Sequence, residues 1–161
     1  MDRQAFDELR ERLFETTPWV VDFLPRQVPR EGGKNYFAVE RYFMAHPQID
    51  ELYGRFARFL VKLSCYYDIE MYDPQSDNWY SDPGPEELMQ RVEACSLPGT
   101  DRYLQILFPG ENAMLTLDSC DLYMALYHPR GELLETATKL SGAEGVFLRP
   151  SVPDELRQEK D

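Results

Sequence analysis

The sequence contains few residues of the kinds that mark secreted or membrane proteins. It has no run of about 18 apolar residues, the length that a membrane-spanning helix needs. Its first residues form no apolar leader segment, so we expect a cytoplasmic protein. Its three cysteines, Cys65, Cys95 and Cys120, are odd in number and widely spaced. This favours buried thiols in a reducing compartment over a disulfide framework.

Metal ligands are equally sparse. The two histidines, His46 and His128, lie far apart, and neither belongs to a zinc-binding motif. Asp73, Asp77 and Asp82 offer oxygen atoms to Ca²⁺, but the run from Asp73 to Asp77 lacks the ligand order and the turn glycine of an EF-hand. We therefore predict neither a metal nor a cofactor.

Motifs of nucleophilic catalysis and of nucleotide binding are lacking too. No nucleophile elbow, Walker pattern or dinucleotide-binding glycine pattern occurs. Cys120 lies between Asp118 and Asp121, and His128 follows at the end of the next predicted strand. A strand of this length, at roughly 3.3 Å per residue, separates Cys120 from His128 by about 20 Å. This distance argues against a Cys-His-Asp site and favours a protein without catalytic activity.

The chain does have enough apolar side chains to fold. Of its 161 residues, 43% are hydrophobic and 13% aromatic, which is too much buryable surface for intrinsic disorder. Because the length suits one domain, we predict a single domain over residues 1–161. Its expected parts are a mostly helical part, 1–64, an α+β part, 65–149, and a polar tail, 150–161.

The first part shows helical periodicity around one stretch rich in breakers. Phe6, Leu9 and Leu13 share one helical face, and the proline that follows must end that helix. Prolines and glycines in 17–35 predict a loop or a short edge strand. A short helix is expected from Tyr36 to Phe43. The clearest helix follows Pro47, and its apolar face comprises Ile49, Leu52, Tyr53, Phe56, Leu60 and Leu63.

The rest of the chain alternates between strand and helix patterns. From Cys65 to Met71 the apolar residues recur every second position, which predicts a half-buried strand. A turn-rich stretch, 73–84, leads to a helix that begins at Pro85. The remaining elements are a helix from about Gly131 to Leu140 and four strands, at 102–108, 113–117, 122–127 and 146–148.

This order predicts an α+β fold with an antiparallel sheet of about four to five strands, because the connections between the central strands are short. If one central strand is an insertion, the order matches the β-α-β-β-α-β pattern of ferredoxin-like domains. The additional N-terminal helices of residues 1–64 are then expected to pack on the sheet.

The net charge of −12 is concentrated in the middle of the chain. Residues 1–64 carry 10 basic and 10 acidic side chains, whereas residues 65–129 carry 2 basic and 12 acidic ones, a net charge of −10. Lys and Arg dominate binding to phosphates, so we expect neither a nucleic acid nor a membrane as partner. Tyr103, Tyr123 and Tyr127 suit one sheet face, as in RNA-binding modules, but the basic RNP pattern is missing.

The densest acidic stretch is also aromatic, and it is the candidate partner-binding surface. Residues 66–87 include seven acids and no Lys or Arg. An acidic surface speeds association with a basic protein, while rigid Tyr and Trp side chains supply contact area. The predicted binding residues are Tyr66, Asp68, Glu70, Tyr72, Asp73, Asp77, Trp79, Tyr80 and Asp82.

Two plainer interpretations of the same residues stay open. In the first, the acids are a solvated strand face that keeps the protein soluble, and their aromatic neighbours pack into the core. In the second, Arg55, Arg58 and Lys62 of the long helix lie against the acidic stretch within the same molecule.

Together these features predict a non-catalytic cytoplasmic interaction or accessory protein of bacterial type. In the sharper form of the hypothesis, it is an inhibitor or antidote that masks the basic active site of a nuclease-like partner. The alternative is a small-molecule-binding domain or minor enzyme with a pocket between sheet and helices. A third hypothesis is a homodimer formed through an edge of the central three-strand meander.

Overall fold

The computed structural model describes residues 2–29, 35–45, 47–97, 102–119 and 121–152. The strands of this part of the chain are β1 Trp19–Asp22, β2 Glu70–Asp73, β3 Asn78–Ser81, β4 Tyr103–Phe108, β5 Ala113–Asp118, β6 Tyr123–Tyr127 and β7 Phe147–Pro150. They form one seven-stranded antiparallel sheet in the order β3-β2-β4-β5-β6-β1-β7. The helices are α1 Arg3–Phe14, α2 Tyr36–Met44, α3 Gln48–Leu63, α4 Pro85–Ala94 and α5 Gly131–Ala143.

The α+β class is confirmed, but the expected four to five strands and the ferredoxin-like order are wrong. Strands β2 and β3 come directly before α4, strands β4, β5 and β6 come directly after it, and β1 lies between β6 and β7 in the sheet. Strand β1 lies in the stretch 17–35, for which the sequence predicts a loop or a short edge strand, and β3 lies in the turn-rich stretch 73–84, for which it predicts no strand. Each strand is only four residues long. Strand β1 is not an edge strand, since it pairs on both sides.

The strand expected from Cys65 begins later, at Glu70. The N–H groups of Ser64, Cys65, Tyr66 and Tyr67 still donate to carbonyls of α3, at 3.0 to 3.1 Å. The apolar alternation in this stretch therefore belongs to the turn that leaves the helix. A period of two over a few residues does not distinguish such a turn from a strand.

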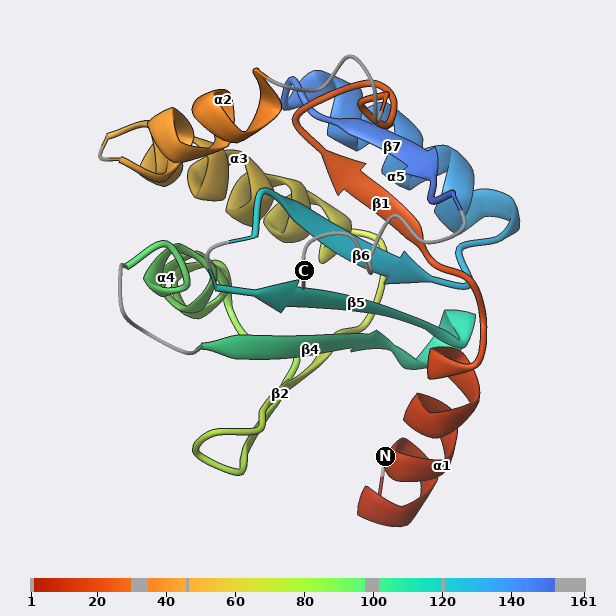
Figure 1. Cartoon of the computed structure of the whole chain (residues 1–161). Helices are drawn as coiled ribbons and strands as arrows, with labels where there is room; N and C mark the ends of the chain where they lie inside the picture. Colours follow the sequence, from red (N-terminus) through yellow and green to blue (C-terminus); the bar gives the residue numbers. More distant parts are fainter. Residues whose placement is uncertain (1, 30–34, 46, 98–101, 120, 153–161) are drawn as a thin grey trace.

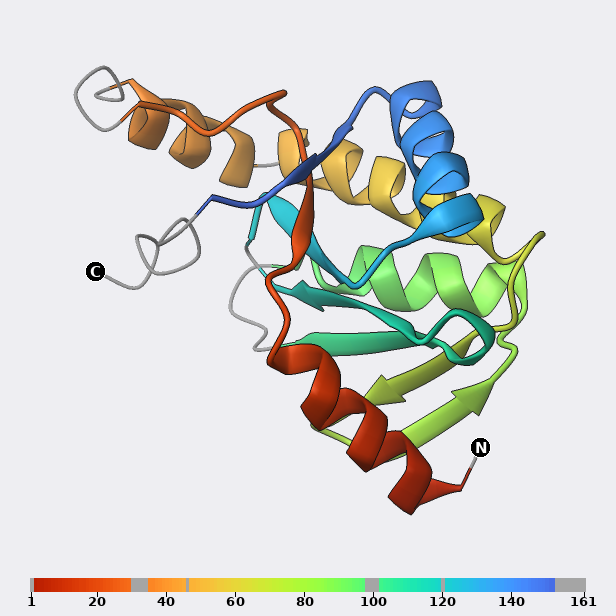
Figure 2. The ribbon, with the colours of Figure 1, turned by 90° about the vertical axis from the view of Figure 1, so that its right-hand side faces the viewer.

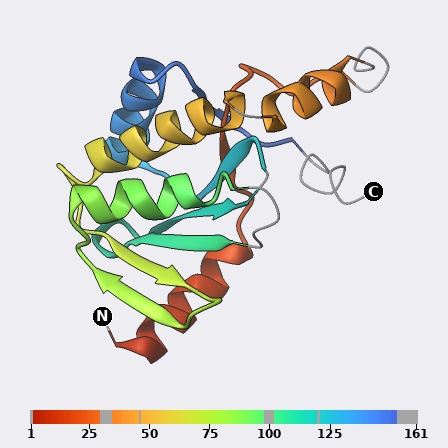
Figure 3. The ribbon, with the colours of Figure 1, turned by 90° about the vertical axis from the view of Figure 1, so that its left-hand side faces the viewer.

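Helices α3, α4 and α5 cover one face of the sheet (Figures 1 and 3). The predicted apolar face of α3 is buried here, and Tyr53, Phe56 and Leu60 have no exposed surface. They pack against inward-facing strand residues such as Ile106 and Leu115 in the main core cluster. This side of the sheet is closed by apolar side chains.

The opposite face carries α1 (Figure 2). The predicted stripe of Phe6, Leu9 and Leu13 is buried against a second, smaller cluster that includes Leu107 and Met114. The carboxylate of Asp2 caps the helix by accepting from the N–H of Ala5, at 2.8 Å. Thus an N-terminal helix does pack on the sheet, although on the side away from α3.

The basic side chains of α3 bind the end of α5, so the idea that they face the acidic stretch is wrong. The carboxylate of Glu144 forms ion pairs with Arg58 at 2.9 Å and with Lys62 at 2.6 Å. Arg55 donates to the backbone oxygen of Glu144, at 3.3 Å. Gly145 has a φ of 75°, and a Cβ there would collide with the Arg55 guanidinium. The Arg55 side chain could move aside, so the reason for glycine here is the positive φ, which other residues adopt only with strain.

Helix α2 has the least cover. None of its residues is buried, and Phe37 and Tyr42 are 62% and 64% exposed. It extends from the body of the molecule beside the start of α3 (Figures 1 and 2).

The helices of the described residues include none that is long and apolar enough to cross a membrane. The predicted polar tail overlaps the end of β7, and from residue 153 it lies outside the described residues.

Candidate functional site

The predicted acidic and aromatic stretch folds mainly as a hairpin of β2 and β3. Its loop is closed by Asp73, whose carboxylate accepts from the Gln75 N–H at 3.0 Å and from the Ser76 hydroxyl at 2.9 Å. Such bonds let a short acidic side chain replace backbone hydrogen bonds in a turn. Asp82 ends the hairpin, and its carboxylate accepts from the Ile69 N–H at 2.9 Å. The carboxylates of Asp73 and Asp82 therefore stabilise the loop and the end of the hairpin through the hydrogen bonds that they accept.

The aromatic residues of one hairpin face lie under α1. Tyr72 and Trp79 are direct cross-strand partners, and their ring centroids are 4.9 Å apart. Phe6 of α1 meets Trp79 edge to face at 3.9 Å and Tyr72 at 5.6 Å. The guanidinium of Arg10 lies 5.9 Å from the centre of the Tyr72 ring. The predicted anchors Tyr72 and Trp79 thus already pack against α1, the chain's own first helix.

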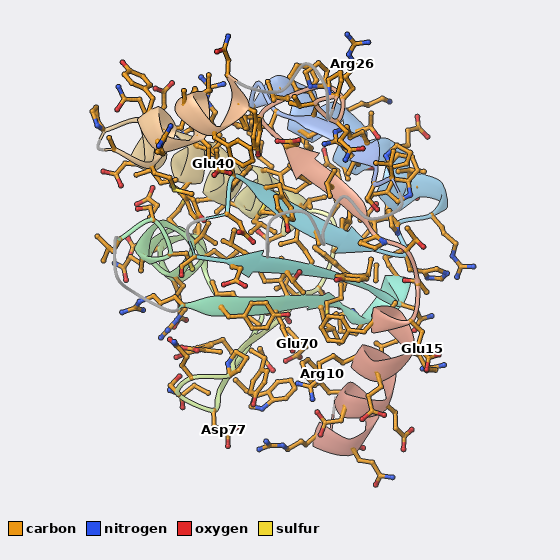
Figure 4. All side chains as sticks on the ribbon, in the orientation of Figure 1. Arg10, Glu15, Arg26, Glu40, Glu70 and Asp77 are labelled. Atoms are coloured by element: carbon orange, nitrogen blue, oxygen red, sulfur yellow. The ribbon has the colours of Figure 1, made fainter. Side chains whose placement is uncertain are left out.

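Asp77, labelled in Figure 4, joins the outer end of this hairpin to α1. It accepts from both terminal nitrogens of Arg3, at 3.0 and 3.3 Å, and from the Tyr72 hydroxyl at 2.9 Å. The hydrogen bond from Arg3 is the main reason that the pKa of Asp77 lies below its ordinary value. Both charged partners are more than half exposed, so the pair is open to screening by salt.

The other hairpin face packs against α4. Tyr80 lies there, and the guanidinium of Arg91 is 3.8 Å from the centre of its ring. Arg91 also pairs with Glu87 at 3.2 Å. On the α1 face, Glu70 accepts from the hydroxyl of Ser81, its cross-strand neighbour, at 2.8 and 3.0 Å.

The predicted site residues therefore divide by exposure. Tyr66 is 67% exposed and lies with Asp68 in the turn between α3 and β2. The structure does not bring all nine residues to one surface, because the two sides of the hairpin face different helices. Tyr66, Asp68, Asp77 and Asp82 are exposed; Glu70, Asp73, Trp79 and Tyr80 are half-buried; Tyr72 is buried.

Sequence reasoning missed a row of polar side chains on the α1 side of the sheet. Gln105 pairs in register with Tyr72 on one side and Thr116 on the other, and directly paired residues share a face. Gln105 and Thr116 are only 5% and 8% exposed. Gln105 accepts from Arg10 at 3.3 Å and donates to the Tyr103 hydroxyl at 3.3 Å. Burial raises the pKa of Tyr103.

A buried ion pair lies on the same face, near the other end of the sheet. Arg149 of β7 donates to Asp22 of β1 at 2.7 Å, and the two side chains are 10% and 14% exposed. Burial raises the pKa of Asp22 despite the opposing effect of Arg149. The two residues lie 127 positions apart in the sequence, so no local pattern indicates their pairing.

Residues considered for metal binding and for catalysis are only partly described. No group of three or more His, Cys, Asp or Glu side chains in the described ranges has the arrangement of a metal site. His128 has a φ of 62°, and its Nδ1 lies 3.1 Å from the backbone oxygen of Asn112. Cys120 and His46 fall outside the described residues.

The three tyrosines that suggested RNA binding have separate contacts. Tyr103 and Tyr127 are both half-buried, and Tyr127 lies against Phe14 of α1, with ring centroids 5.3 Å apart. Tyr123 pairs in register with Asp22. The N-terminal helix therefore accounts for part of this aromatic face.

No protein-family model, curated protein or solved structure matches the chain.

Proposed function

We propose that this chain is a non-catalytic cytoplasmic interaction protein that binds a basic protein through the outward side of its acidic hairpin region. The supporting observation is that only some acids of this region form an ion pair with a basic side chain of the same molecule. Among the described residues of this region, Asp77 pairs with Arg3 and Glu87 with Arg91. The acids left without an ion pair in the described structure are Asp68, Glu70, Asp73, Asp82 and Glu86.

The packing of the hairpin against α1 removes two of the predicted aromatic residues from the proposed binding surface. Because Tyr72 and Trp79 are engaged with α1, the contact area must come from other residues. Tyr66 is an exposed ring beside the acids and suits that role. The sharper form of the proposal remains an inhibitor or antidote, in which the acidic side covers the basic active site of its target.

The test uses two acids that carry no structural hydrogen bond in the described residues, Asp68 and Glu86. The double variant Asp68→Lys/Glu86→Lys reverses their charge. A matched control, Glu15→Lys/Glu132→Lys, changes the net charge equally at sites away from the hairpin; Figure 4 marks Glu15 at the far end of α1. Wild type and both variants serve as baits in a lysate of the native host at low salt, and captured proteins are identified by mass spectrometry.

We expect wild type and control to retain the same basic protein and the hairpin variant to lose it. With the purified partner, the association rate should fall by about tenfold for the hairpin variant, since complementary charge raises such rates by about 10 to 10³. The proposal fails if no basic protein distinguishes the hairpin variant from the control.

A second candidate is a small-molecule site or minor enzyme on the α1 side of the sheet. The polar side chains of Gln105, Thr116 and Tyr103 converge there, whereas the α3 side is packed with apolar residues. Convergent polar groups in a mostly apolar setting are typical of ligand sites. A thermal-shift screen of polar metabolites should then give a hit that Gln105→Leu abolishes and Glu132→Gln retains. Absence of any shift at millimolar concentrations contradicts this candidate.

A further inference from the structure

The sheet ends at β3, the outer strand of the acidic hairpin. Strand β3 pairs with β2 on one side, and among the described residues no strand pairs with its other side. Figures 2 and 3 show this strand at the margin of the molecule, with α1 across one face of the hairpin and α4 on the other. Within the part of the chain that the structure describes, the helices therefore cover the faces of β3 and leave its edge uncovered.

The hydrogen-bond register shows which backbone groups point outward. The N–H of Asp82 donates to the carbonyl of Ile69 at 2.8 Å, so these opposite residues form a hydrogen-bonded pair. In an antiparallel ladder such pairs alternate with pairs that are not bonded to each other. Tyr80 therefore turns its backbone toward β2. Trp79 and Ser81 turn their N–H and C=O groups away from it, toward the open edge.

The same edge is bounded by two aspartates in left-handed backbone conformation. Asp77 has a φ of 52° and Asp82 a φ of 43°, so the extended part between them is limited to Asn78–Ser81. Edge strands are commonly protected by lysine, proline or a bulge. Strand β3 contains none of these, and its one protection is its length of four residues. The carboxylate of Asp82 has no ion pair among the described residues, whereas Asp77 at the other end is paired with Arg3.

Charge decides which kind of strand this edge can accept. Pairing with β3 of a second copy would join two molecules that each carry a net charge of −12, and like charges oppose association. An extended segment carrying Lys or Arg meets the opposite sign at the Asp82 end, where the described residues supply no ion pair; at the other end the Asp77 carboxylate is shared with Arg3. Main-chain hydrogen bonds then supply affinity, and side chains supply selectivity, as in other cases of strand addition.

We infer that the open edge of β3 binds an extended, Lys- or Arg-rich segment of a partner protein by strand addition. The inference rests on the proposed function and deepens it, since it specifies how the acidic hairpin recognises its partner. The contacts are the outward backbone groups of Trp79 and Ser81, with Asp82 facing the basic side chains.

The probe is a blocked eight-residue peptide in which Lys and Val alternate, used with the full-length protein. A control peptide replaces each Val with Pro. It keeps the charge, but its polyproline backbone and missing N–H groups prevent regular strand pairing. Binding is followed by NMR, and amide hydrogen exchange is measured at Trp79, Tyr80 and Ser81.

Two protein variants separate the backbone from the side chain. Ser81→Pro removes the outward N–H, and proline is tolerated on an edge strand. Ser81→Ala is the matched control, because both variants lose the hydroxyl that donates to Glu70 and only the proline loses the N–H. Protection of the Tyr80 amide reports whether the hairpin remains folded.

We expect the Lys-Val peptide to slow exchange at Trp79 and Ser81 by at least about tenfold and to leave Tyr80 unchanged. The Lys-Pro peptide should bind about tenfold more weakly, the effect of about two net hydrogen bonds. Ser81→Pro should weaken Lys-Val binding by about fivefold relative to Ser81→Ala, as expected for one net hydrogen bond.

Equal binding of both peptides with unchanged exchange at Trp79 and Ser81 overturns strand addition while it leaves a charge-driven interaction intact. If neither peptide binds at millimolar concentration, strand addition is also overturned. The proposed function is then decided separately by the capture experiment with the Asp68 and Glu86 variants.

Discussion

Helices α3, α4 and α5 close one face of the sheet with apolar side chains, whereas the other face carries α1 and keeps polar residues such as Gln105 and Thr116. The first face holds the large core cluster. The second holds a small cluster in which Phe6 is the central side chain contributed by α1. Two ion pairs beside these helices also differ in exposure: the Glu144 side chain, between α3 and α5, is 8% exposed, and Asp77, beside α1, is 58% exposed.

This difference explains why the acidic hairpin was hard to interpret from sequence. Its aromatic residues resemble anchors for a foreign protein, yet two of them bind α1. One plainer interpretation holds that the aromatic neighbours of the acids pack into the molecule's own core. The packing of Tyr72 and Trp79 against α1 supports it for these two residues. The acids at the hairpin ends remain at the surface, and the proposed binding of a basic protein depends on them.

The largest expected effect lies on the closed face. Phe56→Ala deletes a fully buried ring of α3 from the main core. Such deletions typically cost about 3 to 5 kcal/mol of unfolding free energy, through lost burial and the cavity that remains. Urea unfolding followed by circular dichroism measures the change. A loss below about 1 kcal/mol would show that this face is not the dominant source of stability.

The same deletion on the α1 face should cost less. Phe6→Ala also removes a fully buried ring, but α1 lies at the end of the chain and can leave the sheet while the main core stays folded. We expect a loss of about 2 kcal/mol in global unfolding, below the range usual for buried Phe. The substitution Trp19→Phe leaves Trp79 as the only tryptophan. As the urea concentration rises, the fluorescence of Trp79 should shift to the red at a lower concentration than the one at which the far-ultraviolet circular dichroism changes.

The comparison breaks down if both signals of Phe6→Ala change together and the loss equals that of Phe56→Ala. In that case α1 belongs to the same cooperative unit as the core, and the two faces differ in composition alone.

Sequence periodicity located the elements whose apolar residues repeat over several turns or strands. The apolar faces of α1 and α3 and the three strands β4, β5 and β6 fall close to the predicted positions. Strand β3 is not predicted, and β1 is predicted only as one of two alternatives, because four residues give too few repeats to establish a period and the turn residues around them dominate the local pattern.

The candidate site was predictable as a composition but not as a set of contacts. The acids of residues 66–87 are evident from the sequence. The partners of Asp77 and Tyr72 come from α1, which lies more than sixty residues earlier. Which face of α1 meets which face of a hairpin depends on the tertiary fold. The polar contact from Arg10 to Gln105, 95 positions apart, is of the same kind.

The smallest expected effect concerns the ion pairs of the two faces. The hydrogen bond from Arg3 holds the pKa of Asp77 below its ordinary value. Burial acts to raise the pKa of Glu144, but the hydrogen bonds and charges of Lys62 and Arg58 outweigh it and lower that pKa overall. Each carboxylate therefore stabilises the fold above its unfolded-state pKa, and this contribution is lost as the pH falls through the folded-state value.

Salt should separate the two carboxylates. In 1 M NaCl the Debye length is about 3 Å, so the exposed Asp77 should return toward its ordinary pKa of 3.8. Glu144 should keep most of its shift below 4.5, because its side chain is only 8% exposed. Carbon-detected NMR titrations at low and high salt measure both values, with Asp77→Asn and Glu144→Gln to assign the signals. If salt moves both pKa values equally, solvent and ions reach the contact between α3 and α5 as freely as they reach the end of the hairpin, and the low exposure of Glu144 does not shelter its ion pairs.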